Sequence, residues 1–476
     1  METSVNELAD ILKSESNIIA KERAVVVFLM QVICWIFVQA LHQVDNSLID
    51  EQKSKGYRIE KMSVRTIVTS FGEIQYTRRR YVDTNGNAIY PLDTLMGWDK
   101  YSRYSTLVVR NLSELATKLT YRSAAKAIEL FAPFSISHQK INALVKEAGQ
   151  NLKKQQTSDQ RYDALENTKR TPKVLYLEGD GFQIKTQGKQ YLEVHRFQIC
   201  EGVQLVGKNR KKRIHSRDFV SIDRQTAMKE LMEYWDNAYN LKQTVIISNG
   251  DGGSGYTKDV FDELSYTAAR HEYFLDAFHV NKKIKDRLYF AKELQGPLIQ
   301  AIWRDYNEKR VTSILDTAES LLIDELDTFQ NREHLRKLRG YLTRNWTHLR
   351  PFHQRQLIGI QKAIGSCESN HRHYTYRMKG QGKYWTEKGA EAIVRLIASL
   401  KNQDLDKWMM TEYESSELIP EVEKRAKAAL RAATSKKWNK ADPHIGAHLV
   451  RIVGSEKFSQ NMRNLVRGIS GRLLSN

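Results

Sequence analysis

The chain has 476 residues, 41% of them hydrophobic, which is enough to build several packed domains and excludes a disordered polypeptide. Lys and Arg total 75 against 56 Asp and Glu, so the formal net charge is +19. Such an excess predicts a polyanionic partner, either nucleic acid or an anionic membrane surface. The cysteines, Cys34, Cys200 and Cys367, lie far apart. Their spacing argues against a disulfide framework and a cysteine-based zinc site, and we expect a reducing cytoplasm.

The first predicted region, residues 1–53, is helical, because apolar positions recur at helical spacing and both Pro and Gly are absent. Within it, Ala24–Val44 is the segment that suggests a membrane. Gln31 and Gln39 interrupt its apolar run, which leaves stretches shorter than the roughly 20 residues that a spanning helix needs. We therefore expect a buried or dimer-forming helix and no membrane anchor.

Two further modules are predicted before the middle of the chain. Residues 54–100 are β-rich, since Met62–Thr69 and Glu73–Val82 flank a turn and form a hairpin pattern. Residues 101–155 return to helix, and Ser123–Phe131 and Ser137–Gly149 have the spacing of a helix-turn-helix. On that interpretation the second helix presents four residues to a DNA groove. They are Ser137, His138, Lys140 and Asn142. An ordinary helical hairpin in a core is the alternative.

Beyond a polar linker, residues 173–295 predict an α/β fold. Three strand-like segments come in succession, and helices and strands then alternate, which describes a mixed sheet covered by helices. Residues 296–362 look wholly helical and basic, and residues 403–476 form a second basic helical region.

Two aspartates stand out inside this predicted sheet. Asp180 follows the apolar strand Val174–Leu177, and Asp251 follows Val245–Ile247. Ligand-binding groups collect near strand ends in such folds, and gathered carboxylates suit Mg²⁺, which prefers oxygen ligands. The alternative is that each Asp-Gly pair simply makes a turn.

Short motifs built around acidic residues occur in order along this region. They are Tyr176–Gly181, Asn249–Gly252, Phe274–His279 and Gly365–Asn370, followed by Arg377–Trp385 and Gly389–Ala392. In this order they resemble the motifs of DDE transposases, specifically bacterial insertion-sequence enzymes allied to the Mutator-like superfamily. The resemblance spans nearly all of Lys173–Leu400.

The resemblance implies a catalytic core of the ribonuclease H-like fold, divided between residues 173–295 and 363–402, with residues 296–362 as an all-helical insertion. It implies that Asp180, Asp251 and Glu368 are the catalytic acids and hold two Mg²⁺ or Mn²⁺ ions.

Asp276 and His279 also match the family pattern, as auxiliary active-site residues. His279 would contact a phosphate or order the site through Asp276, or it is a satisfied histidine at a helix start. Glu178 lies on the same strand face as Asp180, so it is either a fourth ligand or an Arg-paired or solvent-facing carboxylate.

Basic and aromatic side chains follow Glu368 closely. Cations neutralise phosphates and rings stack on unpaired bases, so we expect DNA contacts here, with a solvated charged face as the alternative. The predicted contacts are Arg372, Arg377, Lys379, Lys383 and Trp385.

The sequence thus predicts an insertion-sequence transposase that cleaves transposon ends and joins them to target DNA. Its partners would be terminal inverted repeats, target DNA and a second copy in a homodimer or higher homo-oligomer, in the bacterial cytoplasm at the nucleoid. The alternatives are a transposase-derived DNA-binding protein that does not cleave, a plain metal-dependent nuclease, and a membrane-associated basic protein.

Overall fold

A computed structural model describes residues 2–15, 17–156, 169–188, 190–207, 211–253, 255–357, 359–365, 367–380, 382–410, 425 and 428. The side chains of residues 2–5 and 367–369 lie outside this description. Most of the basic region predicted over residues 403–476 lies outside it too, and α17 (Leu405–Met410) is its described helix.

The N-terminal part contains three helices and a hairpin, as the sequence predicts. The helices are α1 (Glu2–Ser14), α2 (Ile18–Ser47) and α3 (Ile49–Ser54), and the strands are β1 (Arg58–Thr69), β2 (Gly72–Val82) and β3 (Ala88–Ile89). Asn17 caps α2 by accepting a hydrogen bond from the N–H of Ala20. The short α4 (Pro91–Leu95) brings Asp93 against the hairpin, where Arg65, Arg78 and the Tyr76 hydroxyl donate to its carboxylate.

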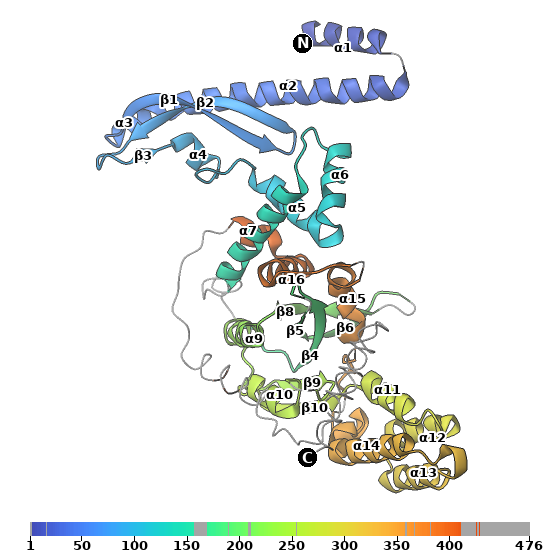
Figure 1. The fold of residues 1–476 in the computed structure, drawn as a ribbon. Helices are drawn as coiled ribbons and strands as arrows, with labels where there is room; N and C mark the ends of the chain where they lie inside the picture. The colour runs from blue at the N-terminus through green and yellow to red at the C-terminus, as the bar shows by residue number, and fades with distance from the viewer. Residues whose placement is uncertain are drawn as a thin grey trace, which may run out of the picture.

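One side of α2 packs on the hairpin and the other remains exposed. Phe37, Val38 and Leu41 contact the cluster that includes Ile74 of β2, and Figure 1 shows α2 extending well past the strands. Within the described residues, Ile18–Ser54 forms one helical stretch long and apolar enough to cross a membrane by length and composition alone.

Three helices connect the hairpin to the central sheet. They are α5 (Thr106–Lys118), α6 (Tyr121–Phe131) and α7 (His138–Gln156), and residues 119–120 and 132–137 separate them. Ser105 and Thr120 cap α5 and α6 with their side-chain oxygens. Side chains of all three helices belong to the apolar cluster that also contains Phe182 and Val194 of the sheet, so these helices share a core with the sheet.

The central sheet has five strands. They are β4 (Val174–Lys185), β5 (Tyr191–Cys200), β8 (Arg217–Ser221), β9 (Val245–Gly250) and β10 (Arg270–Leu275). Their spatial order is β10-β9-β4-β5-β8, in which β4, β5 and β8 are antiparallel neighbours and β9 and β10 run parallel to β4. A separate two-stranded sheet, β6 (Gly202–Leu205) with β7 (Lys211–Ile214), extends from β5. The mixed α/β sheet predicted from the sequence is therefore present.

Helices cover both faces of the central sheet (Figure 1). Leu177 and Phe197 pack with α9 (Arg224–Ala238) and α10 (Lys258–Leu264) on one face. Phe182 and Val194 pack on the other face with α7, α15 (Cys367–Met378) and α16 (Glu387–Asn402). This alternation follows from the two-residue period of a strand.

A helical region follows the last strand, as predicted for residues 296–362. It contains α11 (Ala277–Arg287), α12 (Lys292–Trp303), α13 (Glu308–Ser320) and α14 (Phe329–Asn345), with short 3-10 helices at Asp324–Leu326, Trp346–Leu349 and Phe352–Arg355. The prediction of continuous helix is wrong at its end, because residues 356–357 and 359–365 form no helix. Gln356, Gly359 and Gly365 have φ values of 57°, 73° and 87°, in the left-handed region that stops a helix.

Candidate functional site

Three aspartates lie at the same level on three adjacent parallel strands. The last paired residues of β4 and β9 are Glu178 and Asn249. Asp180 and Asp251 each follow two residues later along the chain. Asp276 directly follows β10, and its N–H donates to the carbonyl of Gly250 at 2.8 Å. Asp180 lies inside β4, because this strand continues past the ends of its two parallel neighbours. The sheet therefore brings together carboxylates that are far apart in the sequence.

The glycines around these aspartates have packing roles. A Cβ at Gly179 would lie 2.9 Å from ring atoms of Phe261 and Tyr256, and one at Gly250 would lie 2.7 Å from the Tyr256 carbonyl. These positions admit only glycine because the loop after β9 crosses close to β4. The interpretation of Asp180-Gly181 as a turn is wrong, since both residues are in β4, whereas Gly252 has φ of 68° and does turn the chain after Asp251.

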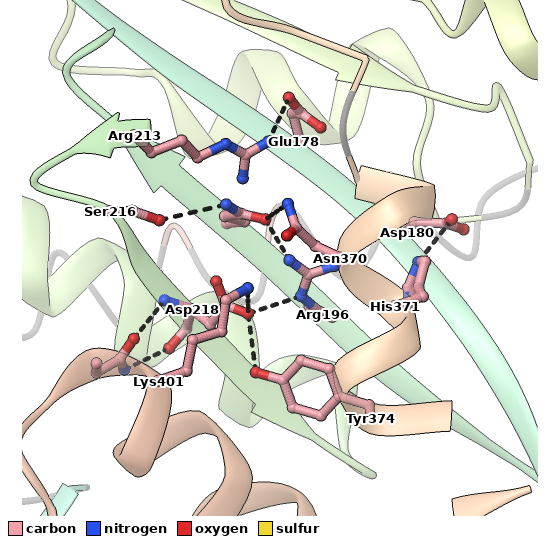
Figure 2. Close-up of polar contacts among 12 residues, drawn as sticks. Glu178, Asp180, Arg196, Arg213, Ser216, Asp218, Asn370, His371, Tyr374 and Lys401 are labelled. Carbon is pink, nitrogen blue, oxygen red and sulfur yellow. Dashed lines mark hydrogen bonds and ion pairs between the residues drawn. The ribbon is translucent and has the colours of Figure 1, made fainter. Parts of the chain in front are cut away.

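The carboxylate of Asp180 is held by a histidine from α15. Nε2 of His371 lies 2.7 Å from Oδ2, and the N–H of Gly181 donates to Oδ1 at 2.7 Å. Figure 2 shows His371 directed from the helix toward Asp180 on the strand. Burial would raise the pKa of Asp180, but the hydrogen bond and charge of His371, with a smaller effect of His279, lower it below its ordinary value. Asp180 is therefore a carboxylate in the folded protein at neutral pH.

Asp276 begins α11 and orders its first turn. Oδ1 accepts a hydrogen bond from the N–H of Phe278 at 2.8 Å, and Oδ2 lies 3.5 Å from Nδ1 of His279. The Asp276 carboxylate raises the pKa of His279 above its ordinary value, against the effect of burial, and Asp180 and Asp251 add to the increase. The imidazole of His279 thus lies in the field of all three aspartates.

A fourth carboxylate, Glu193 of β5, borders the same group. A Cβ at Gly181 would overlap its side chain, which places Glu193 beside the backbone of β4. Burial raises the pKa of Glu193, and Asp251 and Asp180 raise it further, while Arg224 opposes them with Nη2 at 3.6 Å from Oε2. Negative charge therefore accumulates around Asp180 and Asp251.

Glu368, the third predicted acid, is the second residue of α15, and its side chain lies outside the described residues. It precedes His371 by three residues on α15, about one helical turn. No group of three His, Cys, Asp or Glu side chains in the described part of the chain is arranged to hold a metal ion. The described donors of the predicted site are Asp180 and Asp251.

Glu178, two residues before Asp180, is paired with an arginine. Its Oε1 lies 3.3 Å from Nη2 of Arg213 on β7, and the Glu178 side chain is buried. The Arg-paired alternative for Glu178 is the one that the structure supports (Figure 2).

Comparison with known proteins assigns the chain to a family. A family model described as "Uncharacterised protein family (UPF0236)" matches residues 13–415. The chain belongs to this family. A relative from Streptococcus gallolyticus, the "UPF0236 protein in vanSb 3'region", is 34% identical over 402 residues, covering 84% of this chain and 86% of the relative.

A solved structure also overlaps with the UPF0236 chain. The Drosophila P element transposase strand transfer complex covers 74% of this chain and 90% of its own, with 12% sequence identity and a TM-score of 0.22. At this TM-score the likeness does not establish a shared fold.

The five side chains after Glu368 that were predicted to contact DNA divide into a solvent-accessible and a buried group in this UPF0236 chain. Arg372 and Lys379 are exposed, and Lys383 is half-buried. Arg377 and Trp385 are buried, where the arginine Nε donates to the Ala116 carbonyl at 2.6 Å. The Arg377 guanidinium also lies 4.8 Å from the Trp385 ring centroid. Arg377 thus joins α15 to α5, and neither Arg377 nor Trp385 faces solvent.

The four residues predicted to enter a DNA groove lie at the start of α7. Ser137 caps the helix by accepting from the N–H of Lys140 at 3.2 Å. Ser137 and Lys140 are exposed, and His138 and Asn142 are half-buried. Buried and exposed residues alternate along the rest of α7, where Leu144, Val145 and Leu152 are buried and Glu147, Asn151 and Lys154 are exposed, so the helix has one face in the core and one facing solvent.

Two side chains of this site were not predicted as site residues. His371 is not among the predicted residues, although its spacing of three from Glu368 places the two positions about one turn apart on a helix. Glu193 could not be predicted from the sequence, because its position near Asp180 depends on how β5 is aligned with β4. In that alignment Asp180 pairs with Arg196.

Proposed function

We propose that this UPF0236 protein is a metal-dependent DNA transposase of an insertion sequence. The observation that carries the proposal is the placement of Asp180, Asp251 and Asp276 at one level on three adjacent parallel strands, with α15 docked on Asp180 through His371. The strand order, with three leading antiparallel strands and then two parallel ones, supports a ribonuclease H-like core. Residues 296–355 then form its helical insertion.

Asp180, Asp251 and Glu368 would hold two Mg²⁺ or Mn²⁺ ions. The donor set fits these ions, since the ligands are all carboxylate oxygens. Burial raises the pKa of the neighbouring Glu193, and the negative charges of Asp251 and Asp180 raise it further, so the site already holds charge that a cation would neutralise. When bound, a pair of divalent cations stabilises the charge on a phosphate during in-line displacement.

The chain's own residues would orient the reactants. His371 fixes the rotation of the Asp180 carboxylate, and His279, whose pKa is raised, supplies a positive charge beside the scissile phosphate. Water would cleave the phosphodiester at the transposon end and release a 3′ hydroxyl. That hydroxyl would then displace the 3′ oxygen of a phosphodiester in target DNA.

DNA would be held by exposed cations on α15, on the turn after it and on α7. Arg372 and Lys379 project from α15 and the turn after it, and Lys140 projects from the start of α7. These groups would neutralise backbone phosphates and so increase affinity without reading sequence. The excess of 75 basic over 56 acidic residues is consistent with this partner.

Two transposon ends must be paired, so we propose a homodimer built through α2. Its exposed apolar residues Val26, Leu29, Ile33 and Ile36 follow a spacing of three and four, the seam of a coiled coil. Such a dimer would act in the bacterial cytoplasm, where the chromosome is accessible.

The test is cleavage of a labelled terminal inverted repeat by the purified protein with Mg²⁺ or Mn²⁺. Asp180→Asn, Asp251→Asn and Glu368→Gln are each expected to reduce the cleavage rate by at least about 100-fold. Glu178→Gln is the matched control, because this carboxylate lies on the same strand but pairs with Arg213. Undiminished cleavage by the three variants would refute the proposal.

Other outcomes separate the rival functions. Specific binding of the repeat without any cleavage would indicate a transposase-derived DNA-binding protein. Cleavage without joining of the new 3′ end to a target plasmid would indicate a plain nuclease. Flotation of the protein with anionic lipid vesicles would favour a membrane-associated protein.

A further inference from the structure

A buried polar cluster lies beside the candidate site, on the face of the sheet covered by α15 and α16. Its centre is Asp218 of β8, which is 3% exposed. Oδ2 of Asp218 accepts hydrogen bonds from Arg196 Nε at 2.8 Å, the Tyr374 hydroxyl at 2.8 Å and Lys401 Nζ at 2.9 Å. Asn402 completes the cluster by bonding both the N–H and the carbonyl of Asp218.

Arg196 connects this cluster to the catalytic strand. It is fully buried on β5, and it is the ladder partner of Asp180 on β4. Directly opposed residues of an antiparallel pair project from the same face, so the side chains of Arg196 and Asp180 lie on the face of the sheet where α15 packs. Its guanidinium also donates to Gln198, whose Oε1 accepts from Nδ2 of Asn370 at 3.3 Å.

Tyr374 connects the cluster to the helix that carries the remaining site residues. It follows His371 by three residues on α15, and its hydroxyl reaches Asp218 while His371 reaches Asp180. Figure 2 shows these contacts on successive turns of one helix above the same strands. The contacts form a path from Asp180 to His371, along α15 to Tyr374, and on through Asp218 to Arg196, the ladder partner of Asp180.

Stability alone does not account for such a cluster. Burying charged groups costs desolvation free energy that their attraction only partly offsets, and apolar side chains of similar volume often stabilise a protein as well or better. A network of directional hydrogen bonds instead selects one arrangement of the elements that it joins. Here it joins α15 and the C-terminal end of α16 to β5 and β8.

We propose that Arg196, Asp218 and Tyr374 are positioning residues that set the rotation and depth of α15 on the sheet. They thereby determine where Glu368 and His371 stand relative to Asp180. The catalytic consequence rests on the proposed function, whereas the structural consequence, a fixed α15, does not. Neither depends on direct contact between these three residues and DNA.

The test compares two tyrosine variants. Tyr374→Phe removes a hydroxyl that donates to Asp218 at 2.8 Å, and Tyr76→Phe removes a hydroxyl that donates to Asp93 at 2.9 Å in the N-terminal hairpin. Both tyrosines are buried, so the two substitutions are matched in chemistry and surroundings. Four quantities are measured for each variant: amide hydrogen exchange of residues 370–378, the cleavage rate constant, the Kd for the inverted repeat, and Tm.

Tyr374→Phe is expected to accelerate exchange in α15 by about tenfold or more and to slow cleavage by about 10- to 100-fold, the effect of a small misplacement of catalytic groups. The Kd is expected to stay within about twofold, and Tm to fall no further than in Tyr76→Phe. Asn370→Ala, which removes the bond to Gln198, is expected to act in the same direction.

Equal α15 exchange in Tyr374→Phe and Tyr76→Phe would overturn the positioning role. If the wild-type protein cleaves no DNA, the proposed function fails, and the exchange comparison still decides whether the cluster fixes α15. A drop in cleavage accompanied by an equal loss of DNA binding would also contradict the proposal, since it would assign the cluster to the binding surface.

Discussion

Nε2 of His371 and Oδ2 of Asp180 are 2.7 Å apart, although 191 residues separate them in the sequence. This hydrogen bond joins α15 to the middle of β4 and lowers the pKa of Asp180 in spite of burial. A carboxylate whose pKa is lowered by folding adds stability above its unfolded pKa, near 3.9, and the contribution is lost as the pH falls through the folded pKa.

His371→Ala is therefore expected to destabilise the protein by about 1.5–3 kcal/mol at pH 7, the range for a hydrogen bond to a charged group. The difference from wild type should shrink as the pH falls through the titration of Asp180. Urea unfolding at a series of pH values measures it. If the loss of stability came only from lost packing of His371 against Phe182, the difference between variant and wild type would be the same at every pH. That result would contradict a stabilising hydrogen bond between His371 and Asp180.

Asp276→Asn is expected to lower the pKa of His279, because the substitution removes the carboxylate that raises it most. The wild-type imidazole stays protonated to higher pH than a free histidine. Its stabilising effect is present below the unfolded pKa and is lost as the pH rises through the folded pKa. NMR titration of the His279 ring protons measures the change.

Asparagine retains an oxygen that can accept from Phe278, so the cap of α11 is preserved in this variant. Asp262→Asn is the control, since its carboxylate lies 2.6 Å from Nδ1 of His271 and not beside His279. An unchanged His279 titration in Asp276→Asn would show that the raised pKa has another cause.

Gly149→Ala is expected to destabilise the protein by about 1–3 kcal/mol, the cost of overpacking a core. A Cβ at this position of α7 would overlap the backbone and Cβ of Ala392 on α16. Gly340→Ala in α14 is the control, because its Cβ would meet only the flexible end of Arg344 at 3.3 Å. Since alanine favours helix over glycine, Gly340→Ala should be neutral or stabilising by up to about 1 kcal/mol. Thermal unfolding distinguishes the two.

Leu29→Glu combined with Ile33→Glu is expected to convert a dimer to a monomer in light scattering. Each exposed side chain would lose the roughly 1.5–3 kcal/mol that burial at an interface provides, and the new charges would repel. Gln31→Glu is the control, since Gln31 lies on the same exposed helix but outside the apolar seam. A double variant that remains dimeric would rule out this contact.

Regular elements with strong local patterns were predictable from the sequence. The apolar run Val174–Leu177 predicted a strand, and β4 begins there and extends to Lys185. The hairpin β1-β2 and the break between α6 and α7 were also predicted, because turn residues and side-chain caps act locally. β7 was not predicted, since Lys211–Ile214 has no apolar alternation and pairs only with β6.

The candidate site was predictable only in part. The strand-end positions of Asp251 and Asp276 follow from local pattern, whereas the contact of His371 with Asp180 depends on how α15 docks. The break between α11 and α12 at residues 288–291 contains neither Gly nor Pro, so only tertiary packing reveals it. The burial of Arg377 and Trp385 likewise could not be predicted, because basic and aromatic residues at helical spacing suit both a DNA-facing surface and a core.

The central claim is that Asp180, Asp251 and Glu368 together hold divalent cations, and calorimetric titration of the protein with Mn²⁺ tests it most directly. Wild-type protein and the Glu178→Gln control are expected to bind Mn²⁺ alike. Asp180→Asn, Asp251→Asn and Glu368→Gln should each weaken binding by at least about tenfold, as expected when one of few charged ligands is lost. Mn²⁺ affinity that is the same in all five proteins, or no binding by the wild type, would contradict the claim.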